Sequence, residues 1–122
     1  MTIFTSNTLQ LIHRPKEIGI GLHYGALLPD GRAIDFSPKG IRVCTLEEFK
    51  NGHSYTVEKE VTYNNHVNNR LHQLINGRVQ YNFLNFNCEN FARFLAEDKN
   101  ESTQVNGLLI LCIAALFAFS LD

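Results

Sequence analysis

Apolar and polar residues alternate along much of the chain, a pattern typical of β-strands with one buried face. The alternation is clearest over residues 18–28, where every second side chain is apolar or aromatic. Because side chains alternate across a strand, these residues predict one core-facing side and one open side. Shorter extended segments are predicted over 8–12, 32–36, 41–46, 54–61 and 79–86.

Three other segments have helical character. "TLEEFKNG" opens with the capping-box pair Thr45 and Glu48 and ends in Asn-Gly. "NHVNNRLHQLING", residues 65–77, has apolar residues at helical spacing before a terminal glycine, and "NCENFARFLAED", residues 87–98, forms the third. Strands and helices do not alternate regularly, so the sequence predicts an α+β fold with antiparallel strands.

Composition narrows the class of protein. The 122 residues suit one domain, and a formal net charge of −1 with no basic run argues against a nucleic-acid partner. The three cysteines are widely spaced, and the five histidines show no metal-binding spacing. We therefore expect a reducing, intracellular setting and assign no metal and no other cofactor.

The C-terminal segment divides the chain into a domain over 1–106 and an apolar tail over 107–122. Residues 107–119 contain no polar side chain, and as a helix they would cover roughly 20 Å against about 30 Å for a bilayer core. A buried helix and a membrane-associated helix both remain open. The terminal position favours association with a membrane surface through residues 107–120, because a helix that is apolar all round needs burial on every side.

The open side of the 18–28 strand carries a histidine between glycines. Gly21 and Gly25 flank His23 on that side, which leaves space for another element or a ligand. A three-residue loop at 29–31 would place Gly25 opposite Asp35, within diagonal reach of His23. Asp35 could then orient the imidazole. A four-residue loop would turn Asp35 to the other side, and a solvated aspartate near a turn is the alternative.

A cysteine stands at the start of the third helix. Asn87 is the expected N-cap, so Cys88 is the first helical residue, where the helix dipole favours a thiolate. Cys88 also heads an inward stripe with Phe91, Ala92 and Leu95. If this helix lies on the glycine-flanked side of the strand, with Gly21 leaving room for it, the thiol meets His23. Otherwise Cys88 is a small buried hydrophobe.

Two motifs together resemble a known family. "LHYGALLPDGRAIDFSP" and "NCENFARF" are similar to the histidine and cysteine segments of the lecithin:retinol acyltransferase-like family, and the resemblance covers residues 7–120. It implies a circularly permuted papain-like fold of the NlpC-type superfamily, with Cys88 as nucleophile and His23 as general base and acid. The chain departs from the family at Asp35 and at Asn90, where histidines are usual.

The resemblance implies a thiol acyltransferase or phospholipase A-type hydrolase that acts on ester-linked acyl chains of phospholipids through a thioester. The backbone N–H of Cys88, at the helix start, is the expected oxyanion donor. Two other functions remain open. One is a papain-like peptidase or amidase, and the other is a non-catalytic membrane-associated interaction protein that keeps the fold.

Overall fold

The computed structural model of the protein describes residues 7–17, 21–77, 80–82 and 87–97. The apolar tail predicted over 107–122 and its boundary with the domain lie outside these residues, as do positions 18–20 of the predicted histidine strand. Within the described residues, no helix has the length and apolar character needed to cross a membrane.

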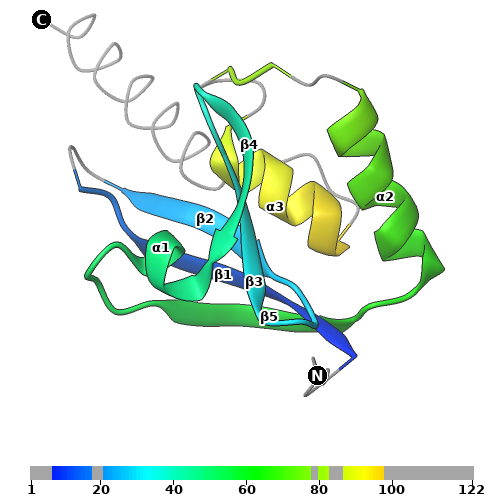
Figure 1. Ribbon diagram of the computed structural model, residues 1–122, viewed down its shortest axis with the longest axis horizontal. Helices are drawn as coiled ribbons and strands as arrows, with labels where there is room; N and C mark the ends of the chain where they lie inside the picture. The colour runs from blue at the N-terminus through cyan, green and yellow to red at the C-terminus, as the bar shows by residue number, and fades with distance from the viewer. Residues whose placement is uncertain (1–6, 18–20, 78–79, 83–86, 98–122) are drawn as a thin grey trace, which may run out of the picture.

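A five-stranded antiparallel sheet, in the order β4-β3-β2-β1-β5, forms the centre of the described chain (Figure 1). The predicted α+β class with antiparallel strands is confirmed. The strands are β1 (Thr8–Pro15), β2 (Leu22–Leu27), β3 (Arg32–Ser37), β4 (Gly40–Thr45) and β5 (Thr56–Thr62).

The three predicted helices are present as α1 (Leu46–Lys50), α2 (Asn65–Asn76) and α3 (Cys88–Glu97). The capping box of α1 forms as expected, since Thr45 Oγ1 accepts from the Glu48 N–H and Glu48 Oε1 accepts from the Thr45 N–H. In α2, the Asn64 side chain accepts from the Val67 N–H and Gly77 ends the helix. Local capping residues therefore set the ends of these two helices.

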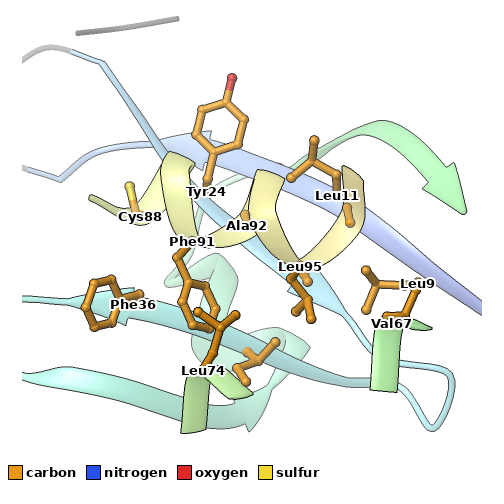
Figure 2. Packing of buried hydrophobic residues seen from close by; sticks show 13 residues of the cluster. Leu9, Leu11, Tyr24, Phe36, Val67, Leu74, Cys88, Phe91, Ala92 and Leu95 are labelled. Atoms are coloured by element: carbon orange, nitrogen blue, oxygen red, sulfur yellow. The ribbon is translucent and has the colours of Figure 1, made fainter. Parts of the chain in front are cut away.

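The larger core lies between the sheet and α3, with α2 beside α3 (Figure 1). Figure 2 shows Phe91 and Leu95 of α3 pointing into the cluster that Phe36 and Leu9 line from the sheet. The inward stripe predicted for this helix is confirmed, because the side chains of Cys88, Phe91, Ala92 and Leu95 are all buried.

A smaller core covers the opposite side of the sheet. Phe49 of α1 is fully buried there and packs against Ile12, Ala33 and Cys44. The sheet alternation makes both cores possible, because Ala33 belongs to the smaller cluster while its neighbour Ile34 belongs to the larger one. The sheet is thus covered by α1 on one side and by α2 and α3 on the other.

Two strands differ most from their predicted bounds. β1 continues from the predicted end at residue 12 to Pro15, with a register irregularity between Leu11 and Ile12. β2 begins at Leu22, because Gly21 has φ 118°, a conformation that other residues rarely adopt. The carbonyl of Gly21 also accepts from the Lys16 N–H at 3.2 Å. Gly21 therefore marks the start of the strand, and the expectation that it makes room for the cysteine helix stays a prediction.

Helix α3 is anchored by a buried ionic network as well as by its apolar stripe. Arg93 donates to Glu89 in α3 at 2.7 Å and to Glu58 in β5 at 2.8 Å, and its guanidinium lies 5.4 Å from the centre of the Tyr24 ring. Glu89 is fully buried, so its charge depends on such hydrogen-bonded partners. The network ties the helix that carries Cys88 to β2 and to the β5 edge of the sheet.

Replacing Arg93 tests how much this network contributes to the free energy of unfolding. We expect Arg93→Met to lower the free energy of unfolding by about 3–5 kcal/mol, because it removes the cation from a buried carboxylate. Arg32→Met is the matched control, since Arg32 pairs with Asp30 at 2.7 Å but its side chain is 61% exposed. The control should lose less than about 1 kcal/mol in urea unfolding monitored by circular dichroism. Equal losses in the two variants would contradict a special contribution from the buried network.

Candidate active site

The β2–β3 hairpin brings His23 and Asp35 together. Its loop is closed by hydrogen bonds from the Leu28 N–H to the Arg32 carbonyl, 2.8 Å, and from the Gly31 N–H to the Leu28 carbonyl, 2.9 Å. The strands then pair in the predicted register, with Gly25 opposite Asp35. In this register Nε2 of His23 lies 2.9 Å from Oδ2 of Asp35. The predicted contact between the two side chains therefore forms.

Arg42 completes the surroundings of the carboxylate and was missed in the sequence. It lies directly opposite Asp35 in the β3–β4 ladder and donates to both oxygens, from Nε at 3.1 Å and from Nη2 at 2.7 Å. Burial by itself raises the pKa of Asp35, but hydrogen bonds from His23 and Arg42 outweigh it and hold the pKa below its usual range. Asp35 is thus a buried, ionised acceptor for the His23 ring.

Gly25 makes room for an aromatic ring. A Cβ at position 25 would lie 2.6 Å from Cε1 of Phe49 and 2.9 Å from the Ile34 carbonyl oxygen. The Phe49 ring stacks on the imidazole of His23, with centroids 5.4 Å apart and planes 27° apart. The expectation that Gly25 only clears a path between His23 and Asp35 is therefore incomplete, since Phe49 fills that space and fixes one side of the imidazole.

Cys88 begins α3 as predicted, and a reciprocal cap holds it there. The Asn87 side chain accepts from the N–H groups of Glu89 and Asn90 at 3.0 and 3.1 Å, and Asn90 Oδ1 accepts from the Asn87 N–H at 2.9 Å. Asn90, where the resembling family usually has histidine, therefore contributes to the helix cap.

The cysteine helix lies on the other side of the sheet from the one expected. Cys88 belongs to the larger core with Tyr24 and Phe36, whereas His23 packs against Phe49 of α1 on the opposite side. The β2–β3 ladder ends at the Gly25–Asp35 pair, while β2 continues along β1 to the Leu22–Pro15 pair. Over the part of β2 that pairs with β1 but not with β3, side chains from the two sides of the sheet can approach each other.

At this point of the sheet Cys88 and His23 line one cleft, and the interaction between the thiol and the imidazole shifts the pKa of both groups. Because Nε2 of the ring is engaged by Asp35, Nδ1 is the nitrogen left to exchange a proton with the thiol. The Leu22 carbonyl oxygen lies 3.9 Å from the sulfur, and the backbone N–H of Tyr24 contributes to lowering the pKa of the thiol. The three predicted residues Cys88, His23 and Asp35 thus form one connected array.

The array shifts both titrating groups toward an ion pair. Burial by itself raises the pKa of the Cys88 thiol, but hydrogen bonds from His23 and from the Tyr24 N–H outweigh it and lower the pKa below the ordinary value. Burial also lowers the pKa of His23, but its hydrogen bonds with Asp35 and Cys88 outweigh this effect and raise the pKa. Both directions favour thiolate beside imidazolium near neutral pH.

The array opens to the surface through a cleft of about 630 Å³ that Cys88 and His23 line. Aromatic rings of Phe36 and Tyr81 form part of its wall. Four charged side chains also line the cleft, and three of them are cationic: Arg14, Lys16, Lys39 and the anionic Glu17. A second hollow of about 520 Å³ lies on the Asp35 and Arg42 side of the same histidine.

Tyr81 lines the same cleft as Cys88 and His23. Burial and the negative charge of the Cys88 thiolate raise the pKa of the Tyr81 phenol, against a lowering effect of the Cys88 backbone N–H. The tyrosine ring is held against Phe36, with centroids 5.3 Å apart. Tyr81 is the second site residue that the sequence did not reveal.

Cys44 and the remaining histidines do not join the array. Cys44 is buried in the smaller core, and burial raises the pKa of its thiol. His66 and His72 lie exposed on α2. In the part of the chain that the structure describes, no group of three or more His, Cys, Asp or Glu side chains is arranged to hold a metal ion.

Thiol reactivity as a function of pH tests the ion pair. We expect iodoacetamide to alkylate Cys88 quickly at pH 6.5, where an ordinary thiol with pKa near 8.5 is only about 1% thiolate. The sign follows from the lowered pKa of Cys88, which keeps the thiolate populated as pH falls below the ordinary value. His23→Gln should move the rate profile to higher pH and slow alkylation at pH 6.5 by at least about tenfold. An unchanged profile, measured by intact mass, would mean that His23 does not activate the thiol.

Gly25→Ala tests whether the Phe49 ring needs the space that Gly25 leaves beside His23. The added methyl meets both a ring and a backbone oxygen, so we expect a loss of about 1–3 kcal/mol in stability and slower alkylation of Cys88 at neutral pH. Gly31→Ala is the control, because position 31 has φ 89° and nothing lies within 4 Å of the added Cβ. It should lose about 1–2 kcal/mol through backbone strain while alkylation stays at the wild-type rate. The same alkylation rate in Gly25→Ala would show that Phe49 does not orient His23.

Comparisons of the chain with protein-family models, with curated proteins and with solved structures gave no significant match. The assignment of the site to a reaction therefore depends on the side-chain geometry together with the resemblance of its two sequence motifs. The geometry by itself describes a thiol at a helix start, paired with an imidazole that a buried carboxylate orients.

Proposed function

We propose that the protein is a thiol-dependent acyltransferase or hydrolase that acts on ester-linked acyl chains of phospholipids through a thioester on Cys88. The observation that carries the proposal is the connected array of Cys88, His23 and Asp35 at the base of an open cleft. A nucleophile, a base within hydrogen-bond reach and a group that orients the base are the parts that covalent acyl transfer requires.

In the acylation step, the Cys88 thiolate attacks the ester carbonyl carbon, a C–S bond forms and the carbonyl oxygen becomes an oxyanion. The imidazolium of His23 then gives its Nδ1 proton to the ester oxygen as the C–O bond breaks and the alcohol leaves. Asp35 and the stacked Phe49 keep the ring in one orientation throughout this transfer. The product is an acyl thioester on Cys88 and a neutral His23.

In the deacylation step, His23 removes a proton from an incoming water, alcohol or amine, which attacks the thioester carbon. The C–S bond breaks, the thiolate returns and the imidazolium is restored. Water as acceptor makes the protein a hydrolase, and an alcohol or amine makes it a transferase. The cleft of about 630 Å³ has room for an acceptor beside an ester group.

The composition of the cleft supports a phospholipid donor. Phe36 and Tyr81 provide apolar surface near the thiol for an acyl chain. Lys16, Lys39 and Arg14 line the same cleft against the single anionic Glu17, and a net cationic lining suits the phosphate of a lipid headgroup. The apolar segment predicted over 107–120 would hold such a site at a membrane surface, where its substrate is concentrated.

A circularly permuted papain-like fold is part of the proposal. Two features support it: the order of the site residues along the chain, His23, then Asp35, then Cys88, and the packing of the cysteine helix against an antiparallel sheet. The contact of Asp35 Oδ2 with Nε2 supports its role in the position of the family's second histidine.

An acyl adduct is the direct test. We expect full-length protein incubated with phosphatidylcholine vesicles to gain the mass of a fatty acyl group, located at Cys88 by peptide mapping. Cys88→Ala should gain nothing, and Asp35→Asn should gain it at least about tenfold more slowly because the imidazole is no longer held by an ionised carboxylate. Cys44→Ala is the matched control and should still gain the adduct on Cys88, because Cys44 lies in the smaller core and does not line the cleft.

The alternatives predict different results in the same experiment. A peptidase or amidase would show fast alkylation of Cys88 by iodoacetamide but no lipid adduct. A non-catalytic interaction protein would show neither an adduct nor a dependence of alkylation on His23. Either result would overturn the lipid acyl-transfer proposal.

A further inference from the structure

Arg14 is a buried cation beside His23. It is only 9% exposed and lies directly opposite His23 in the β1–β2 ladder, so both side chains project from the same side of the sheet. Its Nε donates to the Phe49 carbonyl, and its Nη1 donates to the Pro15 carbonyl at 2.8 Å. Within the described residues, no carboxylate forms an ion pair with Arg14. Its positive charge therefore lacks an anionic partner from this part of the chain.

Arg93 is buried to a similar extent and shows how such a cation is usually compensated. Arg93 is 7% exposed and pairs with three carboxylates, those of Glu58, Glu89 and Glu97. A guanidinium loses hydration on burial, so an arginine is rarely buried without such partners. At Arg14 the compensation consists of two carbonyl oxygens and the face of the Phe49 ring, whose centroid lies 5.7 Å from the guanidinium carbon.

The guanidinium of Arg14 keeps N–H groups that can bind a ligand. A guanidinium carries five N–H donors, and the two hydrogen bonds to carbonyls leave three of them, two on Nη2 and one on Nη1. No fully buried side-chain nitrogen of the described residues lacks a partner, so Nη2 is not enclosed by protein. Arg14 lines both the cleft of about 630 Å³ that contains Cys88 and the hollow of about 520 Å³ that contains Asp35. Its remaining donors are therefore accessible from these hollows.

We infer that Arg14 is a substrate-binding residue whose remaining N–H groups hold the phosphodiester of the acyl donor while the donor's ester lies at Cys88. This inference rests on the proposed acyl transfer and names the residue that recognises the headgroup phosphate. Arg14 and Cys88 line one cleft, so the phosphate and the ester of a single donor share it. A guanidinium suits this group because its adjacent N–H donors match two oxygens of one phosphate.

Two other charged residues of the cleft differ from Arg14 in exposure. Lys39 is exposed, and water screens an ion pair formed with it. Glu17 is exposed as well, and within the described residues it forms no ion pair with Arg14, so it does not compete for the remaining donors. A buried cation attracts an anion more strongly than an exposed one, because less solvent screens the charge. Arg14 is therefore the cation from which we expect the larger contribution to phosphate binding.

Two esters that differ only in the headgroup test this role. Dihexanoylphosphatidylcholine carries the phosphodiester and dihexanoylglycerol lacks it, and each would be offered in monomeric form to the full-length protein. We expect Arg14→Met to lower the ratio of kcat/KM for the phospholipid to kcat/KM for the glycerol ester by about 10- to 100-fold, the usual effect of losing a hydrogen bond between charged groups. A loss of packing at Phe49 would slow both reactions and cancel in this ratio.

Arg70→Met is the matched control. Arg70 also donates to a backbone carbonyl, that of Leu95 at 3.0 Å, but it lines neither hollow beside His23. The ratio in this variant should equal that of the wild type. Arg14→Lys keeps a positive charge near the phosphate, so it should keep a larger share of the ratio than Arg14→Met, and it provides the test if the methionine variant does not fold.

Binding of the headgroup alone is the second readout, and it needs no turnover. Glycerophosphocholine carries the phosphodiester without acyl chains, and its binding to the full-length protein can be followed by phosphorus NMR. We expect its Kd to rise at least about tenfold in Arg14→Met and to stay unchanged in Arg70→Met. Inorganic phosphate is titrated in parallel, because it distinguishes a site for free phosphate from a site for a lipid headgroup.

Three results would overturn the inference. An unchanged ratio in Arg14→Met, with equal losses on both esters or with none, would mean that Arg14 does not recognise the phosphate. An unchanged Kd for glycerophosphocholine would mean the same. Binding of inorganic phosphate through Arg14 without binding of glycerophosphocholine would assign the residue to free phosphate. A wild-type protein that turns over neither ester but binds glycerophosphocholine through Arg14 would instead overturn the proposed function and leave Arg14 as a phosphodiester-binding residue.

Discussion

The pairing of Gly25 with Asp35 is the constraint on which the rest of the site depends. A shift of one residue in this register would turn Asp35 to the other side of the sheet, away from His23. The same pairing places the Cβ-free position where the Phe49 ring must lie. On the other side of β3, the tight turn before Gly40 brings Arg42 opposite Asp35. One hairpin register therefore positions the carboxylate, the imidazole and the ring that covers it.

The site also depends on the segment of β2 that has no hydrogen-bonded partner in β3. His23, Asp35 and Phe49 lie on the side covered by α1, whereas Cys88 and Phe36 belong to the core under α3. They meet because β2 extends beyond its pairing with β3. This arrangement leaves the thiol within the core packing and still in contact with a cleft, although Cys88 is only 2% exposed.

The charged groups of the site form a series in which each group interacts with a neighbour of opposite charge. Arg42 neutralises the buried Asp35 carboxylate, Asp35 stabilises a protonated His23, and His23 stabilises the Cys88 thiolate. Burial opposes ionisation at Asp35, His23 and Cys88, and at each of them hydrogen bonds to a neighbour reverse its effect. Burial is offset in the same way within α3, where the buried Glu89 carboxylate accepts a hydrogen bond from Arg93. The chain thus uses paired charges both to hold α3 in place and to activate the residue at its start.

The sequence by itself determined the parts of this protein that depend on local periodicity and capping. The α+β class and the three helices follow from alternation and cap residues. The hairpin register and the contact of His23 with Asp35 follow once the loop is known to have three residues, which the structure shows. Arg42 could have been found by counting across the next turn. Only the tertiary structure decided which side of the sheet α3 covers, that Phe49 fills the space at Gly25, and that Tyr81 lines the cleft of Cys88. These contacts join segments far apart in the chain, and no local pattern encodes them, because their geometry arises from the packing of whole elements against each other.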